Sequence, residues 1–130
     1  MNIGDISKLT GMPAKTIRYY EEIGLVAPPR DINGYRSFGE EDVHRLTFLS
    51  RSRALGFSIE ECRRLLDLWQ NQTRASSDVK AMVAEHISNV DRKISDLQGI
   101  RETLSALSKS CAGDDRPDCP IIDGLSAKVP

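Results

Sequence analysis

The stretch TIRYYEEIGLVAPPRDINGYRSF, residues 16–38, decides the fold, because a short helix, a helix break and a hairpin signal follow one another within it. Its first half continues a helical pattern that starts at Pro13, a favourable residue for a first turn, and ends at Gly24. The Pro-Pro pair at 28–29 excludes further helix. The Asn-Gly pair at 33–34 favours a tight hairpin turn between strand-forming residues. The stretch therefore predicts a helix followed by a small β-hairpin, or wing.

Further short helices lie on both sides of this stretch. Apolar residues at three-residue spacing in IGDISKLTG, residues 3–11, predict a helix that ends at its glycine and completes a helix-turn-helix. Residues 39–56 read as a helix with acidic residues at its start, where the helix dipole favours them. SIEE, residues 58–61, matches a capping box and places another helix after it. The predicted fold class is mainly α, with a winged helix-turn-helix domain over residues 1–70.

A long helical pattern occupies residues 76–108. Its apolar residues recur at steps of three and four, close to a heptad seam: Val79, Val83, Ile87, Val90, Ile94, Leu97, Ile100, Leu104 and Leu107. At about 1.5 Å per residue this helix spans roughly 48 Å, more than the N-terminal helices can cover. The sequence offers no second long helix, so we expect a second copy of the chain to cover the seam in a homodimer.

Composition indicates an ordinary globular protein, with 28% charged and 39% apolar residues. No apolar run approaches the roughly 20 residues that span a bilayer, and the N-terminus lacks a secretory signal pattern. We therefore expect a cytoplasmic protein without a membrane partner. Nothing resembles a catalytic triad, a phosphate-binding loop or a dinucleotide loop, so we do not expect an enzyme. The net charge of −1 counts mildly against a nucleic-acid partner, so such a partner requires a local cluster of basic residues.

Basic and tyrosyl side chains do cluster on the helix-turn-helix and the wing. The second helix of such a motif enters the major groove of double-stranded DNA, where arginine reaches base edges and tyrosine reaches phosphates. The candidate DNA contacts are Lys15, Thr16, Arg18, Tyr19 and Tyr20 on this helix, Arg30, Tyr35 and Arg36 on the wing, and Arg53 on the next helix. The alternative is an ordinary solvated helix face. If the residues do bind DNA, we expect the acids Glu21, Glu22 and Asp31 to face away from it.

Taken together, these segments resemble the DNA-binding domain of the MerR family of transcription regulators. TIRYYEEIGL and NGYRSF carry most of the resemblance, and SDVK and CAGDDRPDCPII extend it into the copper-efflux branch, to about residue 125. The resemblance implies a dimer joined by antiparallel long helices on a promoter whose spacer is too long. The effector-bound dimer then distorts the operator so that RNA polymerase engages both promoter elements. By motif, Arg18 and Tyr20 belong to the recognition helix, and Tyr35 and Arg36 to the wing.

Cys111 and Cys119 are the candidate metal ligands in a C-terminal loop, short helix and tail over residues 109–130. Zinc takes about four ligands, so two thiols are too few for it. Two thiolates suit a soft monovalent ion, which is Cu(I) and also Ag(I) or Au(I). Pro120 is a good first helical residue, which makes Cys119 a helix cap whose thiol pKa is lowered. The thiols therefore favour Cu(I), and the resemblance implies a sensor that activates an efflux or detoxification promoter.

Two residues at the start of the long helix bear on metal selectivity and charge compensation. Zinc-responsive relatives carry a cysteine where this sequence has Ser76, and a neutral hydroxyl is a poor third ligand. Ser76 equally suits a helix cap. Lys80, supplied by the partner subunit, would offset the net negative charge of two thiolates and one monovalent ion.

Two other hypotheses stay open. Cysteines eight positions apart in a loop can reach disulfide geometry, which would make the chain a thiol-disulfide redox regulator that binds DNA. A small thiol metallochaperone with incidental basic helices would neither dimerise nor bind a promoter.

Overall fold

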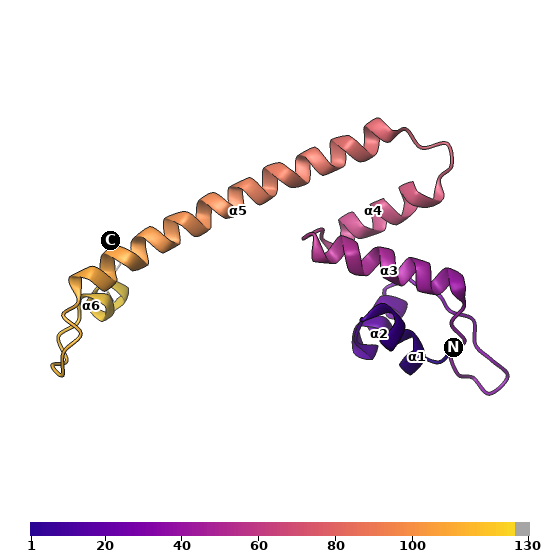
Figure 1. Cartoon of the computed structure of the whole chain (residues 1–130), viewed down its shortest axis with the longest axis horizontal. Helices are drawn as coiled ribbons and strands as arrows, with labels where there is room; N and C mark the ends of the chain where they lie inside the picture. The colour runs from indigo at the N-terminus through magenta and orange to yellow at the C-terminus, as the bar shows by residue number, and fades with distance from the viewer. Residues whose placement is uncertain (127–130) are drawn as a thin grey trace. The chain divides into compact units, whose positions relative to one another are not determined.

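The computed structural model describes residues 1–126, which form helices joined by turns (Figure 1). The helices are α1 (Ile3–Thr10), α2 (Ala14–Glu22), α3 (Glu40–Ala54), α4 (Ile59–Gln70), α5 (Ser76–Ser110) and α6 (Pro120–Ser126). The predicted mainly α fold is confirmed. The chain divides into two compact units inside α5, after Lys80. The domain limits 1–70, 76–108 and 109–130 stay a prediction, and the end of the predicted tail lies outside the described residues.

Helices α1 and α2 form the predicted helix-turn-helix. At the start of α1 the Asn2 side chain accepts a hydrogen bond from the Asp5 N–H at 2.8 Å, and the Asp5 carboxylate accepts one from the Asn2 N–H at 3.3 Å. This capping box satisfies donors that the first turn leaves without partners. The helix ends at Gly11, whose φ of 72° lies in the left-handed region that favours glycine. The tight turn after it brings α2 against α1.

Helices α3 and α4 complete the core of the first unit. Ser58 and Glu61 form the predicted capping box at the start of α4, with bonds of 2.9 and 3.1 Å. Helix α3 packs against both α1 and α4. The most deeply buried large side chains are Ile6, Ile17, Leu25, Val26, Leu46, Leu49, Cys62 and Leu66. Cys62 is therefore a core residue, as its place on an apolar stripe predicts, and burial raises the pKa of its thiol.

In the wing, a single antiparallel bridge between Arg30 and Arg36 takes the place of paired strands, and no strand occurs in residues 1–126. The Ser37 N–H donates to the Pro29 carbonyl at 2.8 Å beside this bridge. The predicted β-hairpin is thus reduced to two short extended arms. Such a short ladder contributes little stability by itself, so the position of the wing depends on side-chain contacts.

The turn at the wing tip also differs from the prediction. Gly34 has a φ of 80°, but Asn33 does not adopt a positive φ, so the turn is not the tight Asn-Gly type. The Asp31 carboxylate accepts hydrogen bonds from the N–H groups of Asn33 at 2.9 Å and Tyr35 at 3.0 Å. Aspartate commonly bends the backbone in this way, and here it produces a wider turn.

Helix α5 matches the predicted long helix and extends it by two residues at the C-terminal end. Its seam is exposed along much of its length, with exposed fractions of 55% for Ile87, 49% for Ile94 and 64% for Leu97. Exposed apolar stripes of this length mark interaction surfaces. None of the helices in residues 1–126 is long and apolar enough to cross a membrane.

Helix α6 begins at Pro120 as predicted and packs on the last turns of α5. A Cβ added at Gly124 would lie 3.1 Å from a side-chain carbon of Leu107, so the glycine permits a close approach of the two helices. The loop between these helices carries Cys111 at one end and Cys119 at the other.

Candidate DNA-binding surface and cysteine site

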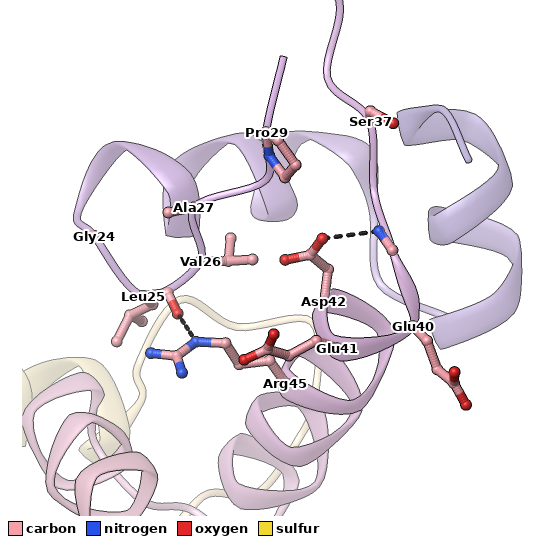
Figure 2. A pocket seen from close by; sticks show the side chains of 11 residues that line it. Gly24, Leu25, Val26, Ala27, Pro29, Ser37, Glu40, Glu41, Asp42 and Arg45 are labelled. Carbon is pink, nitrogen blue, oxygen red and sulfur yellow. Dashed lines mark hydrogen bonds between the residues drawn. The ribbon is translucent and has the colours of Figure 1, made fainter. Parts of the chain in front are cut away.

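The C-terminal end of α2 is held by two arginines from the helices behind it. Arg63 on α4 donates to the Ile23 carbonyl at 2.9 Å. Figure 2 shows Arg45 on α3, which donates through Nε to the Leu25 carbonyl at 2.7 Å. Ile23 ends α2 and Leu25 lies just beyond it, where carbonyls have no partner within the helix, so these bonds satisfy groups that would otherwise need water. The two arginines fix α2 to the core of the first unit.

A cleft of about 530 Å³ adjoins this contact, between the segment that follows α2 and the first turn of α3. In Figure 2 the Asp42 carboxylate accepts the N–H of Gly39 at 2.9 Å, which caps α3. None of the predicted contact residues lines the cleft. We therefore do not include it in the candidate DNA-binding surface.

The outer face of α2 carries the predicted groove contacts. Lys15, Arg18 and Tyr19 are exposed, and Thr16 is partly exposed. Residues three and four apart lie on one face of a helix, which brings Lys15, Arg18 and Tyr19 together. With 48% of its surface exposed, Tyr19 presents a large part of its ring and hydroxyl to a ligand. These residues stay the predicted DNA contacts.

Tyr20 and Arg53 lie differently from the other predicted contacts. Tyr20 is only 5% exposed, and burial raises the pKa of its phenol, while the Arg53 guanidinium that hydrogen-bonds to it acts in the opposite direction. Arg53 also donates to the Phe57 carbonyl at 2.7 Å. A buried tyrosine offers little surface to DNA. We therefore interpret Tyr20 as a core residue that Arg53 supports from α3, rather than as a phosphate contact.

Glu21 contacts two basic residues of the wing, and the expectation that it faces away from DNA stays a prediction. Its Oε1 lies 2.9 Å from Nη2 of Arg30, and its Oε2 accepts from Nε of Arg36 at 2.5 Å. Tyr35, the third predicted wing contact, is 72% exposed. Asp31 forms part of the wing turn itself. One carboxylate on α2 therefore holds both arms of the wing and offsets part of their positive charge.

Sequence reasoning assigned no role in this surface to Glu21, Arg45 or Arg63. Glu21 contacts residues 9 and 15 positions away, and the two arginines contact residues 20 and 40 positions away. The spacing of residues along the sequence does not predict such contacts, because the partners of long side chains depend on how the helices pack.

The two loop cysteines lie side by side, with 3.4 Å between Sγ of Cys111 and Sγ of Cys119. Both are half-buried free thiols. The Cys111 N–H donates to the Ser108 carbonyl at 3.2 Å, which continues the last turn of α5. The Cys119 carbonyl accepts the Asp123 N–H at 3.0 Å, which joins it to the first turn of α6. Two helix ends thus bring the thiols together.

Backbone N–H groups at the start of α6 lower the pKa of the Cys119 thiol. The N–H of Ile122 has the largest effect, followed by the Cys111 thiol and, to a smaller extent, by the N–H of Ile121. Hydrogen bonds of this kind stabilise the thiolate over the thiol. The predicted effect of the short helix on Cys119 is therefore seen in the structure.

Cys111 and Cys119 are the candidate donors, and residues 1–126 contain no group of three or more His, Cys, Asp or Glu side chains placed to hold a metal ion. The loop carboxylate of Asp114 pairs with Arg116 at 3.0 Å. Metal–thiolate bonds in proteins are about 2.3 Å long, so sulfurs 3.4 Å apart are near enough for one ion to contact both. The site thus fits an ion that accepts two soft ligands.

Ser76 and Lys80 lie in the first turns of α5. Ser76 is the first residue of the helix, and the Asp78 N–H donates to the Ala75 carbonyl at 3.0 Å just before it. Lys80 is exposed. The expected roles of Ser76 in selectivity and of Lys80 in charge compensation stay predictions.

Iodoacetamide is expected to alkylate Cys119 at a lower pH than Cys62. The thiolate is the reactive form, and the lowered pKa of Cys119 lets it form earlier as pH rises, whereas burial raises the pKa of Cys62 and blocks access to it. The measurement is peptide mass spectrometry after brief reaction between about pH 6 and pH 9. An identical pH profile for Cys119 in the folded and the denatured chain would contradict the expectation.

Comparison with known proteins gives matches over most of the chain. The family model described as MerR HTH family regulatory protein matches residues 1–69, and the model described as MerR, DNA binding matches residues 43–107. The HTH-type transcriptional regulator HmrR of Rhizobium leguminosarum bv. viciae is 54% identical over 126 residues, covering 97% of this chain and 98% of that protein. The HTH-type transcriptional regulator CueR of Salmonella typhimurium is 49% identical over 127 residues, covering 97% and 92%.

A solved structure is also similar along nearly the whole chain. The transcription regulator PbrR691 from Ralstonia metallidurans CH34, solved in complex with lead(II), matches with a TM-score of 0.81 and 32% identity. The match covers 97% of this chain and 99% of that one.

Proposed function

Because the chain belongs to the MerR family of helix-turn-helix regulatory proteins, we propose that it is a transcription regulator that senses Cu(I) through Cys111 and Cys119. It is a metal-responsive, DNA-binding regulator and not an enzyme. The observation that carries the choice of ion is the number and kind of donors, two thiols that lie side by side in one loop. Two soft ligands and no third donor among the described residues favour a monovalent soft ion over zinc. Ag(I) and Au(I) share this preference.

The charge of the site supports a contribution from the partner subunit. Two thiolates and one monovalent cation leave a net charge of −1, which needs a neighbouring positive group when water is excluded. Lys80 lies at the start of α5 and the cysteine loop follows its end, so an antiparallel partner helix would bring its own Lys80 towards the loop. Ser76 would lie nearby and offer only a neutral hydroxyl, which disfavours divalent ions.

On the DNA side, we propose that α2 enters the major groove through Lys15, Arg18 and Tyr19, and that Arg36 and Tyr35 place the wing on the backbone. The exposure of the α2 residues supports this assignment. The exposed seam of α5 supports a homodimer, and a two-fold symmetric dimer matches two operator half-sites. Metal binding would then distort the operator so that RNA polymerase can use an efflux or detoxification promoter. Since the proposed partner is promoter DNA, we place the protein in the cytoplasm.

The 3.4 Å separation of the two sulfurs favours a second candidate, a thiol-disulfide switch on a DNA-binding regulator. Thiols this close need only a small movement to form a disulfide. The two functions differ in what the site holds: a metal ion in the first, a covalent bond in the second.

Native mass spectrometry with and without Cu(I) decides between these functions. We expect one added copper ion per chain, with thiol protons displaced by the ion and no disulfide formed, because two thiolates bind the ion without being oxidised. Cys62→Ala provides the control, since its thiol is buried in the core. A chain that retains no copper and loses two hydrogens under mild oxidation would support the redox switch and overturn the Cu(I) assignment.

A further inference from the structure

We propose that Glu21 is a positioning residue, which fixes the wing against the recognition helix α2 and thereby sets the preference of the chain for its operator over other DNA. The inference rests on the DNA-binding function proposed above. Glu21 touches no DNA in this proposal; it acts through Arg30 and Arg36.

The Glu21 carboxylate binds both arms of the wing, one with each oxygen. One oxygen binds Arg30 on the outgoing arm, and the other binds Arg36 on the returning arm, at 2.9 and 2.5 Å. Arg30 also donates to the Gly34 carbonyl at the wing tip, at 3.3 Å. The side chains of Glu21 and Arg36 are 21% and 24% exposed, so water screens this pair less than a surface ion pair.

The base of the wing is fixed by Phe38, which is buried and exchanges two hydrogen bonds with Met1, but its tip has few other contacts. Its backbone contributes one bridge, and the residues near its tip are open to solvent, with exposed fractions of 100% for Ile32 and 72% for Tyr35. A two-stranded ribbon without a buried apolar face is marginal by itself. The bonds to Glu21 join the two arms of the wing directly to α2, beyond the contacts at its base.

Glu21, the acceptor in these bonds, is held in place by the helix that carries it. Glu21 lies in the last turn of α2, and the carbonyls that follow it are bound by Arg45 and Arg63 from the core of the first unit. The carboxylate is thus presented from a fixed helix end. We infer that this side chain helps to set the spacing between the groove contacts on α2 and the backbone contacts on the wing.

Charge and position have opposite consequences for DNA binding. Removing the negative charge of Glu21 makes Arg30 and Arg36 available to any phosphate, which strengthens binding to all sequences. Releasing the wing also lets its phosphate contacts form when α2 is not aligned with the operator bases. The difference in affinity between operator and other DNA then becomes smaller. A residue that acts only through charge would raise both affinities equally.

Glu21→Gln tests the proposal, with Glu22→Gln as its matched control. The control makes the same change of charge at the next position, and Glu22 is exposed, with no bond to the wing among the described residues. In the free protein, hydrogen exchange is measured at the amides of Asp31 and Ser37, which bond across the wing. We expect both to exchange roughly five-fold faster in Glu21→Gln and at the wild-type rate in Glu22→Gln.

The DNA measurement uses a duplex that the wild-type chain selects from a random-sequence pool, and a scrambled duplex of the same composition. We expect Glu21→Gln to lower the ratio of the two affinities by about ten-fold and to steepen the salt dependence on scrambled DNA by about 0.9 in logarithmic slope. Glu22→Gln should leave the ratio unchanged. Equal changes in both variants, or unchanged wing exchange in Glu21→Gln, would overturn the positioning role. A wild-type chain that selects no duplex would instead overturn the proposed function, and the exchange measurement would still decide whether Glu21 holds the wing.

Discussion

Cys119→Ser is expected to abolish induction by Cu(I), while the metal-free protein binds its operator within about two-fold of the wild-type affinity. Serine is a good helix cap, so the start of α6 keeps a side-chain acceptor in this variant. Its hydroxyl is neither soft nor ionised at neutral pH, so the site is left with the single thiolate of Cys111. The substitution therefore removes the ligand and preserves the local fold.

Two measurements check this expectation. A reporter driven by a promoter fragment that the protein selects gives the response to Cu(I), and fluorescence anisotropy gives the affinity for the same fragment. Cys111→Ser should behave in the same way, because each thiol supplies half of the donor set. Cys62→Ala should retain the response. Full induction by either loop variant would show that the metal binds elsewhere.

Ile94→Glu is expected to convert the dimer into monomers and to reduce operator affinity by at least about 100-fold, since one subunit then binds one half-site. Ile94 lies near the middle of the α5 seam and is 49% exposed in the single chain. In an antiparallel pair of helices, residues near the middle meet their own copies across the two-fold axis. Burying this side chain contributes about 1.5–3 kcal/mol per subunit, and the variant places two like charges together instead.

Sedimentation equilibrium measures the association state, and circular dichroism confirms that each variant remains helical. Ser95→Glu is the matched control, because it introduces the same charge one position away from the seam. The control should remain dimeric. A dimeric Ile94→Glu protein with unchanged operator affinity would show that another surface joins the subunits.

Local signals in the sequence were sufficient for the helices. Gly11, the Ser58–Glu61 capping box and Pro120 each act within one helical turn, so their effects appear in the structure at the residues predicted. The seam of α5 could be predicted for a related reason: periodicity fixes which side chains share a helix face, and no contact has to be known.

The parts that could not be predicted depend on tertiary contacts or on small local competitions. Tyr19 and Tyr20 are adjacent, and composition does not decide which faces the core; the packing of α2 against its neighbours does. In the wing, the Asp31 carboxylate accepts hydrogen bonds from two backbone N–H groups of the turn. These bonds favour the wider turn over the tight Asn-Gly turn that was predicted. The sequence placed Cys111 and Cys119 in one loop, but their sulfur separation follows from how α6 folds back on α5.

The hydrogen bonds that Arg45 and Arg63 donate at the end of α2 limit how this helix can move. The carbonyls of Ile23 and Leu25, directly after α2, accept bonds from α4 and α3, so a shift of α2 against these helices has to break both bonds. We therefore expect α2 to move together with the rest of the first unit when the protein responds to a signal.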